Sequence, residues 1–173
     1  MITRKILPIM AVAVCLLTGC ESSGKVHDKA YLRSVVIDGS SYTMTFFSDD
    51  QKPVEVNAED PVQAKNEAGL TLGKEVFTGY TELVILQQTD SRSVMESLLK
   101  GWKVSPTCMT VVGKGDFSGA DPEKLEGEIK LAIKQGNAPE CDIITVLSRL
   151  LTEESAQTAC ITPEGCDSTA ELR

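Results

Sequence analysis

An uninterrupted apolar run at residues 83–86 constrains the fold of this chain more than any other feature. Its residues are Leu, Val, Ile and Leu, and polar residues flank them on both sides. A strand that is apolar on both faces is predicted to lie inside a sheet, where other elements cover each face. A second, mainly apolar run at 108–112, with Thr110 at its centre, is followed by a Gly-Lys-Gly turn. The sequence therefore predicts two central strands.

Strand and helix signals surround these two runs. Residues 31–37 and 42–47 are rich in β-branched and aromatic residues, and Asp38-Gly39 between them predicts a hairpin. Residues 54–56 predict a short third strand. Four segments are predicted to be helices. Three of them open at an aspartate suited to cap a helix N-terminus, Asp60, Asp90 and Asp121, and the last begins at about Asp142. This order predicts an α+β or mixed α/β fold, a single domain with a mixed β-sheet packed by about four helices.

The single tryptophan belongs to the second of these helices. Met95, Leu98 and Trp102 recur there at helical spacing. We therefore expect Trp102 to lie in the core.

Charge and composition exclude several classes of function. The 173 residues contain 17 basic and 25 acidic side chains, a formal net charge of -8, so nucleic acid is excluded as a partner. Because the chain contains a single histidine, His27, most kinds of catalytic and metal site that use histidine are excluded. The Gly113-Lys114-Gly115 turn lacks the spacing of a phosphate-binding loop. We predict no catalytic set, no cofactor and no metal site, and hence a protein that is not an enzyme.

The N-terminal segment predicts export and lipid attachment. Arg4 and Lys5 precede an apolar stretch at 6–17, which is too short to span a bilayer. The following Thr-Gly-Cys resembles a bacterial lipobox, so residues 1–19 are predicted to be a signal peptide and Cys20 to be acylated. The lipid bilayer is then a partner through Cys20, and the protein is held on the outer face of the cytoplasmic membrane. Residues 20–30 are predicted to be a flexible tether.

Four cysteines remain in the exported part: Cys108, Cys141, Cys160 and Cys166. They permit three pairings. A disulfide between Cys160 and Cys166 would close a short loop containing proline and glycine, and export permits it without requiring it. Unpaired, buried thiols are the alternative. We expect the folded domain to span 31–155 and a cysteine-containing tail to span 156–173.

Motifs across this domain are similar to those of the N-terminal domain of the Ger(x)C family, the lipoprotein C subunits of spore germinant receptors. The matching residues are found in the family's order: Cys20, Ile37-Asp38, Gly73-Lys74, Phe77, Gly79, Leu83-Val84-Ile85 and Val111-Val112-Gly113-Lys114-Gly115. The chain departs from the family at Tyr80, where histidine is common, and at Glu21-Ser22, where Trp-Asp is common. Family members are also longer and have further domains.

The resemblance implies a non-enzymatic receptor subunit at the spore inner membrane. Such a subunit works beside two integral membrane subunits in nutrient sensing, and we expect its exposed helix faces to contact them. A stand-alone solute-binding or interaction lipoprotein is the alternative. An exported thiol-dependent enzyme is a weaker one.

Overall fold

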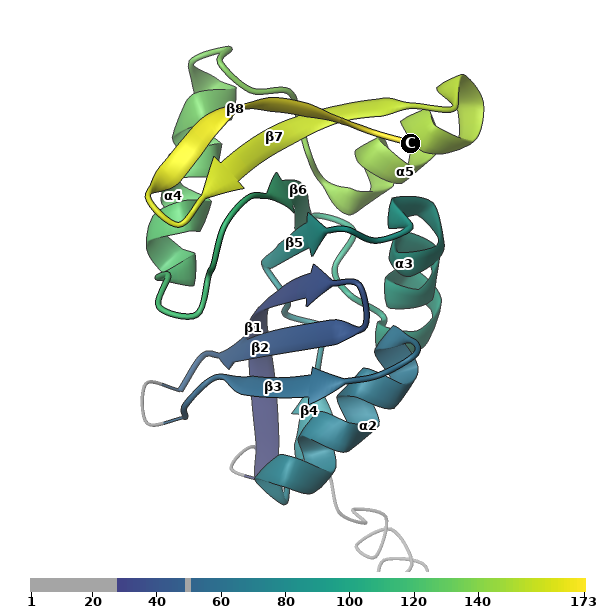
Figure 1. Cartoon of the computed structure of the whole chain (residues 1–173), viewed down its shortest axis with the longest axis vertical. Helices are drawn as coiled ribbons and strands as arrows, with labels where there is room; N and C mark the ends of the chain where they lie inside the picture. The colour runs from purple at the N-terminus through teal and green to yellow at the C-terminus, as the bar shows by residue number, and fades with distance from the viewer. Residues whose placement is uncertain (1–27, 49–50) are drawn as a thin grey trace, which may run out of the picture.

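The computed structural model describes residues 28–48 and 51–173, which form a mixed eight-stranded sheet with four helices (Figure 1). The predicted fold class, an α+β single domain with a mixed sheet, is confirmed. In chain order the elements are β1 (Lys29–Asp38), β2 (Ser41–Phe46), β3 (Val54–Asn57), α2 (Pro61–Leu72), β4 (Glu75–Phe77), β5 (Leu83–Gln87), α3 (Ser91–Ser97), a π-helical turn η2 (Leu98–Trp102), β6 (Met109–Gly113), α4 (Pro122–Lys134), α5 (Ile143–Glu153), β7 (Ala156–Thr162) and β8 (Gly165–Leu172).

Four parallel strands occupy the middle of the sheet. The strand order is β3-β2-β1-β5-β6-β7-β8, and β4 pairs separately with the first residues of β1. Strands β1, β5, β6 and β7 are parallel to one another, so Val36, Ile85 and Val111 lie side by side. All four residues of the 83–86 run are buried, as expected for a strand covered on both faces.

The four helices cover the two faces of the sheet unequally. Figure 1 shows α2, α3 and α5 along one side of the sheet and α4 on the other. Helix α4 packs against β8, α5 against β7, and α2 against β3 and β4. On β2, the buried Tyr42, Met44 and Phe46 alternate with half-buried polar residues. The polar side of β2 therefore belongs to the face that α4 covers only in part.

The three predicted helix caps are present, and Asp142 caps α5 in the same way. Each aspartate side chain accepts a hydrogen bond from a backbone N–H in the first turn of its helix, the geometry that stabilises a helix start. The pairs are Asp60 with Gln63, Asp90 with Ser93, Asp121 with Glu123, and Asp142 with Thr145. Proline follows the cap in α2 and α4, where its missing N–H costs no hydrogen bond.

Trp102 lies in the core, as predicted, with 2% of its surface exposed. Its indole Nε1 donates a hydrogen bond to the carbonyl of Pro61, and its own carbonyl accepts one from the Thr78 hydroxyl. The chain then turns sharply at Lys103, which has a positive φ of 55°. Trp102 therefore ties the end of the α3–η2 segment to the start of α2.

The ends of the predicted domain need correction. Strand β1 begins at Lys29 and buries Ala30, so the last residues of the predicted 20–30 tether belong to the sheet. Residues 156–173 are a β-hairpin, not a tail, because β7 pairs with β6 through Cys160 and Ile161 and buries both. The predicted signal peptide, Cys20 and His27 lie outside the described residues.

Candidate functional site

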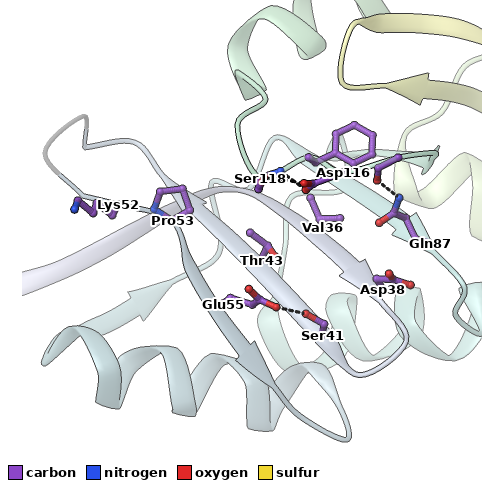
Figure 2. A pocket seen from close by; sticks show the side chains of 12 residues that line it. Val36, Asp38, Ser41, Thr43, Lys52, Pro53, Glu55, Gln87, Asp116 and Ser118 are labelled. Atoms are coloured by element: carbon purple, nitrogen blue, oxygen red, sulfur yellow. Dashed lines mark hydrogen bonds between the residues drawn. The ribbon is translucent and has the colours of Figure 1, made fainter.

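Two hollows on the α4 side of the sheet are the candidate sites of the described structure. The first, the polar hollow, has a volume of about 600 Å³ and lies at the carboxyl ends of β1 and β5 (Figure 2). Its floor includes Val36 and Thr43, and the loop after β6 forms one wall. Ligands of α/β sheets commonly bind at this end of parallel strands.

Two pairs of polar side chains in this hollow are hydrogen-bonded to each other. Figure 2 shows the Ser41 hydroxyl donating to Glu55, 3.1 Å away, and Ser118 donating to Asp116 on the opposite wall. The backbone N–H of Ser118, and then its hydroxyl, lower the pKa of Asp116. Asp116 is therefore an ordinary ionised carboxylate. Each pair joins a serine hydroxyl to a carboxylate, and no hydrogen bond of the described residues connects either carboxylate to a third side chain that would orient it as a general base.

The second, the aromatic–acidic hollow, has a volume of about 710 Å³ and lies at the opposite, amino ends of β5 and β6. Its lining includes Tyr31, Phe47, Tyr80, Glu82, Glu126 and Lys130. These residues come from β1, the turn after β2, the segment before β5, and α4. No single stretch of sequence contains the site.

Tyr31 and Tyr80 line one side of the aromatic–acidic hollow, and Phe77 packs against both of their rings. Tyr31 stacks on Tyr80 with ring centroids 6.1 Å apart and an interplanar angle of 16°. The Phe77 ring packs edge-on against Tyr80, at 5.1 Å, and tilted against Tyr31, at 5.5 Å. Tyr80 nevertheless leaves 63% of its surface exposed. A large aromatic side chain this exposed is available to a ligand or partner.

The segment before β5 fixes these rings. The Thr81 N–H and hydroxyl both bond to the carbonyl of Thr78, which closes a turn around Tyr80. The Phe77 ring lies over Gly79, where a Cβ would come within 2.9 Å of the ring. Glycine at this position therefore lets Phe77 and Tyr80 pack closely.

Glu82, Glu126 and Lys130 also line the hollow and belong to a group of charged side chains that includes Arg33 and Glu123. Arg33 bridges Glu82, at 3.2 Å, and Glu123, at 3.0 Å. Lys130 pairs with Glu126, whose side chain is only 11% exposed. The described network thus holds three carboxylates and two cations, which leaves one excess negative charge.

The carboxylates influence each other. Burial raises the pKa of Glu82, and the neighbouring carboxylate of Glu126 raises it further, against the opposing effect of Arg33. For Arg33, burial alone would lower the pKa, but the hydrogen bond to Glu123 and the charges of Glu82 and Glu123 raise it overall. Glu82 and Glu126 therefore lie close enough to repel each other, and the positive charges of Arg33 and Lys130 do not fully offset this repulsion.

Cys108, Cys141, Cys160 and Cys166 are free thiols in the structure, so the Cys160–Cys166 disulfide is not present in it. Cys166 pairs across the hairpin with Ile161, the neighbour of Cys160, and adjacent strand residues point to opposite faces. Burial raises the pKa of Cys141 to about 12 and raises that of Cys108 as well. Neither thiol is ionised near neutral pH, and thiolate chemistry requires that ionised form.

Within residues 28–48 and 51–173, no cluster of three or more His, Cys, Asp or Glu side chains is arranged to hold a metal ion. The helices of this same part are all too short or too polar to cross a bilayer.

The sequence analysis did not identify either hollow. Tyr31, Tyr80, Glu82 and Glu126 are far apart in sequence and become neighbours only through the parallel pairing of β1 with β5 and the packing of α4. The chain matches no protein-family model, and searches of curated proteins and of solved structures return no match either.

Proposed function

We propose that this protein is a lipid-anchored, non-enzymatic subunit of a spore nutrient germinant receptor that acts through protein–protein contacts. The lipobox-like sequence at Cys20 supports the anchor, and the Ger(x)C-like motifs support the receptor. On this proposal its partners are the bilayer and the integral membrane receptor subunits, and it resides at the spore inner membrane.

The exposed aromatic surface formed by Tyr80 and Phe47 is the observation that carries the proposal. Both side chains are exposed although they are large and apolar, and Tyr80 follows Gly79 of the Ger(x)C-like segment. Tyrosine and phenylalanine are enriched in interface cores, where they bury much area at small entropic cost. The other large exposed hydrophobic residues of the described structure are all aliphatic and lie on helices α2, α4 and α5: Val62, Leu70, Leu131, Ile144 and Leu151. We therefore place the contact at the aromatic surface instead of the helix faces expected from sequence.

Site-specific crosslinking tests the contact directly. A photoreactive phenylalanine analogue at position 80 should crosslink to an integral membrane receptor subunit in intact spores of the native host. The same analogue at Leu70, which is 78% exposed on α2, is the matched control and should not. Equal crosslinking from both positions would contradict the proposed surface.

Genetic deletion tests the receptor role. Loss of the gene should impair germination triggered by nutrients and leave germination by non-nutrient triggers intact, since a receptor subunit acts upstream of the shared release steps. The Cys20→Ala chain should lose processing or membrane retention, because acyl chains supply the membrane affinity. Unchanged responses to every nutrient, with no paralogue to compensate, would contradict the receptor role.

The alternative function is a stand-alone extracytoplasmic binding lipoprotein. The two hollows favour it, since their volumes of about 600 and 710 Å³ fall within the range of small-ligand sites. It predicts expression in vegetative cells and no crosslink to germinant receptor subunits.

A further inference from the structure

We infer that the aromatic–acidic hollow binds a small organic cation that carries an alkylammonium group. The rings of Tyr31 and Tyr80 would hold it on one side and the carboxylates of Glu82 and Glu126 on the other. The inference rests on the surface named in the proposed function and assigns it a ligand chemistry. It does not depend on which protein the chain contacts.

The aromatic wall supplies the first half of the recognition. The negative face of an aromatic ring attracts a cation, and several rings together form the cages that bind alkylammonium groups. The chain's own cations already use the outer rings in this way. Lys29 Nζ lies 5.7 Å from the centroid of Phe77, and the Arg33 guanidinium carbon lies 5.3 Å from that of Phe47. Tyr80, at the mouth of the hollow, is paired with neither of these cations.

The carboxylate wall supplies the second half. The charged groups that line the hollow are Glu82, Glu126 and Lys130, and outside the lining Arg33 pairs with both Glu82 and Glu123. Their charges sum to one excess negative, and Glu82 and Glu126 repel each other. An incoming cation would reduce that repulsion, whereas an anion would add to it.

The dimensions fit a small ligand. A volume of about 710 Å³ lies within the range of small-molecule sites. The lining combines apolar rings and Met109 with a few charged groups, the usual composition of such sites.

Choline and its neutral isostere 3,3-dimethylbutan-1-ol provide the test. The full chain is purified in a non-ionic maltoside detergent, since phosphocholine detergents would compete. Binding is followed by NMR chemical shifts in low-salt buffer, where electrostatic attraction is least screened. Choline should shift the resonances of Tyr80, Glu82 and Thr107, and the isostere should bind more weakly. Equal binding of the two, or choline shifts elsewhere, would overturn the inference.

Three variants give effects of different sign. Tyr80→Ala should weaken choline binding about two- to thirtyfold, the range expected for loss of a cation–π contact. Glu82→Gln should weaken it about two- to fivefold. Lys130→Met should strengthen it about two- to fivefold, because it frees Glu126 from its own partner. A side chain that only supports the fold would not produce this gain, and weaker binding by Lys130→Met would refute the inference.

A matched control and a folding check complete the design. Glu55→Gln makes the same charge change in the polar hollow and should leave choline affinity unchanged. Thermal unfolding of each variant establishes that it is folded, and Tyr80→Phe should retain binding.

The source of the cation is resolved by competition. If choline suppresses the position-80 crosslink, the site takes a lysine side chain of the partner protein instead of a free ligand. If the crosslink persists with choline bound, the hollow binds a free small-molecule cation. Crosslinking can also fail while choline binds, and that result rejects the receptor contact alone.

Discussion

Replacing Trp102 by alanine is the most direct test of how the α3–η2 segment is attached to α2. Trp102 is the single tryptophan of the chain, is 2% exposed, and bonds to Pro61 through its indole N–H. It thus joins two elements whose contacting residues are 41 positions apart. The alanine variant removes both the packing and the hydrogen bond.

The magnitude follows from these two losses. Truncating a buried aromatic to alanine removes its apolar burial and leaves a cavity, which costs about 3–5 kcal/mol of unfolding free energy. Trp102→Phe keeps most of the volume but removes the indole donor, so it should cost about 1–2 kcal/mol. Leu70→Ala, at an exposed position of α2, should change stability by less than about 0.5 kcal/mol.

Equilibrium urea unfolding gives all three values. Far-UV circular dichroism is the signal to use, because the alanine and phenylalanine variants lack the tryptophan fluorescence of the native chain. The expected order of stability is native, Leu70→Ala, Trp102→Phe, Trp102→Ala. A loss below about 1 kcal/mol for Trp102→Ala would refute the packing of Trp102 against α2.

Three further predictions concern the sheet and its thiols. Thr110→Val should leave stability unchanged or raise it by about 1 kcal/mol in urea unfolding, because the buried Thr110 hydroxyl has no hydrogen-bond partner among the described residues; a loss above about 1 kcal/mol would contradict this. Gly113→Ala should cost about 1–3 kcal/mol in the same assay, since its methyl would clash with Ile85 and lie 2.9 Å from Phe117 Cε2; a neutral result would contradict the close packing there. A maleimide added to the folded protein should label Cys166 before the other described cysteines, because those are buried. Mass spectrometry of peptides identifies the labelled residue, and labelling of a buried thiol first would contradict this prediction.

Local chemistry made the helices and central strands predictable. An aspartate cap depends on residues two or three positions apart, so Asp60 and Asp121 identify helix starts without knowledge of the tertiary fold. The run at 83–86 needs burial on both faces wherever it lies. Both features depend on short-range sequence, and both predictions were correct.

The hairpin at 156–173 and the hollows depend on pairing between distant segments. Strand β7 combines small and polar residues with cysteine, so its sequence does not indicate that Cys160 is buried. The pairing of β7 with β6 accounts for this burial. The aromatic–acidic hollow likewise needs α4 to bring Glu126 beside Glu82, although 44 positions, the difference of the two residue numbers, separate them. Amphipathic spacing predicted helix α4 but not the part of the sheet that it covers.

The pH dependence of stability tests the charge arrangement in the same hollow. Because the folded-state pKa of Glu82 is raised above its unfolded value, near 4.3, the folded protein keeps the proton longer than the unfolded chain. Stability from Glu82 is then fully present below the unfolded pKa and is lost as the pH rises through the folded pKa. Glu96 and Asp116 have lowered pKa values and contribute the opposite slope, so the whole-protein profile alone does not isolate Glu82.

Comparing the native chain with Glu82→Gln removes those common contributions. The amide introduced by this substitution does not titrate, so the stability of the native chain relative to the variant should fall with increasing pH across the window that begins near 4.3. The change should remain below about 1 kcal/mol, because the Glu82 side chain is 37% exposed and solvent screens its interactions. Urea unfolding at a series of pH values measures it. If Arg33 dominated, the folded pKa of Glu82 would be lowered and the relative stability would rise with pH, so the sign of the slope distinguishes a compensated ion pair from a carboxylate crowded by Glu126.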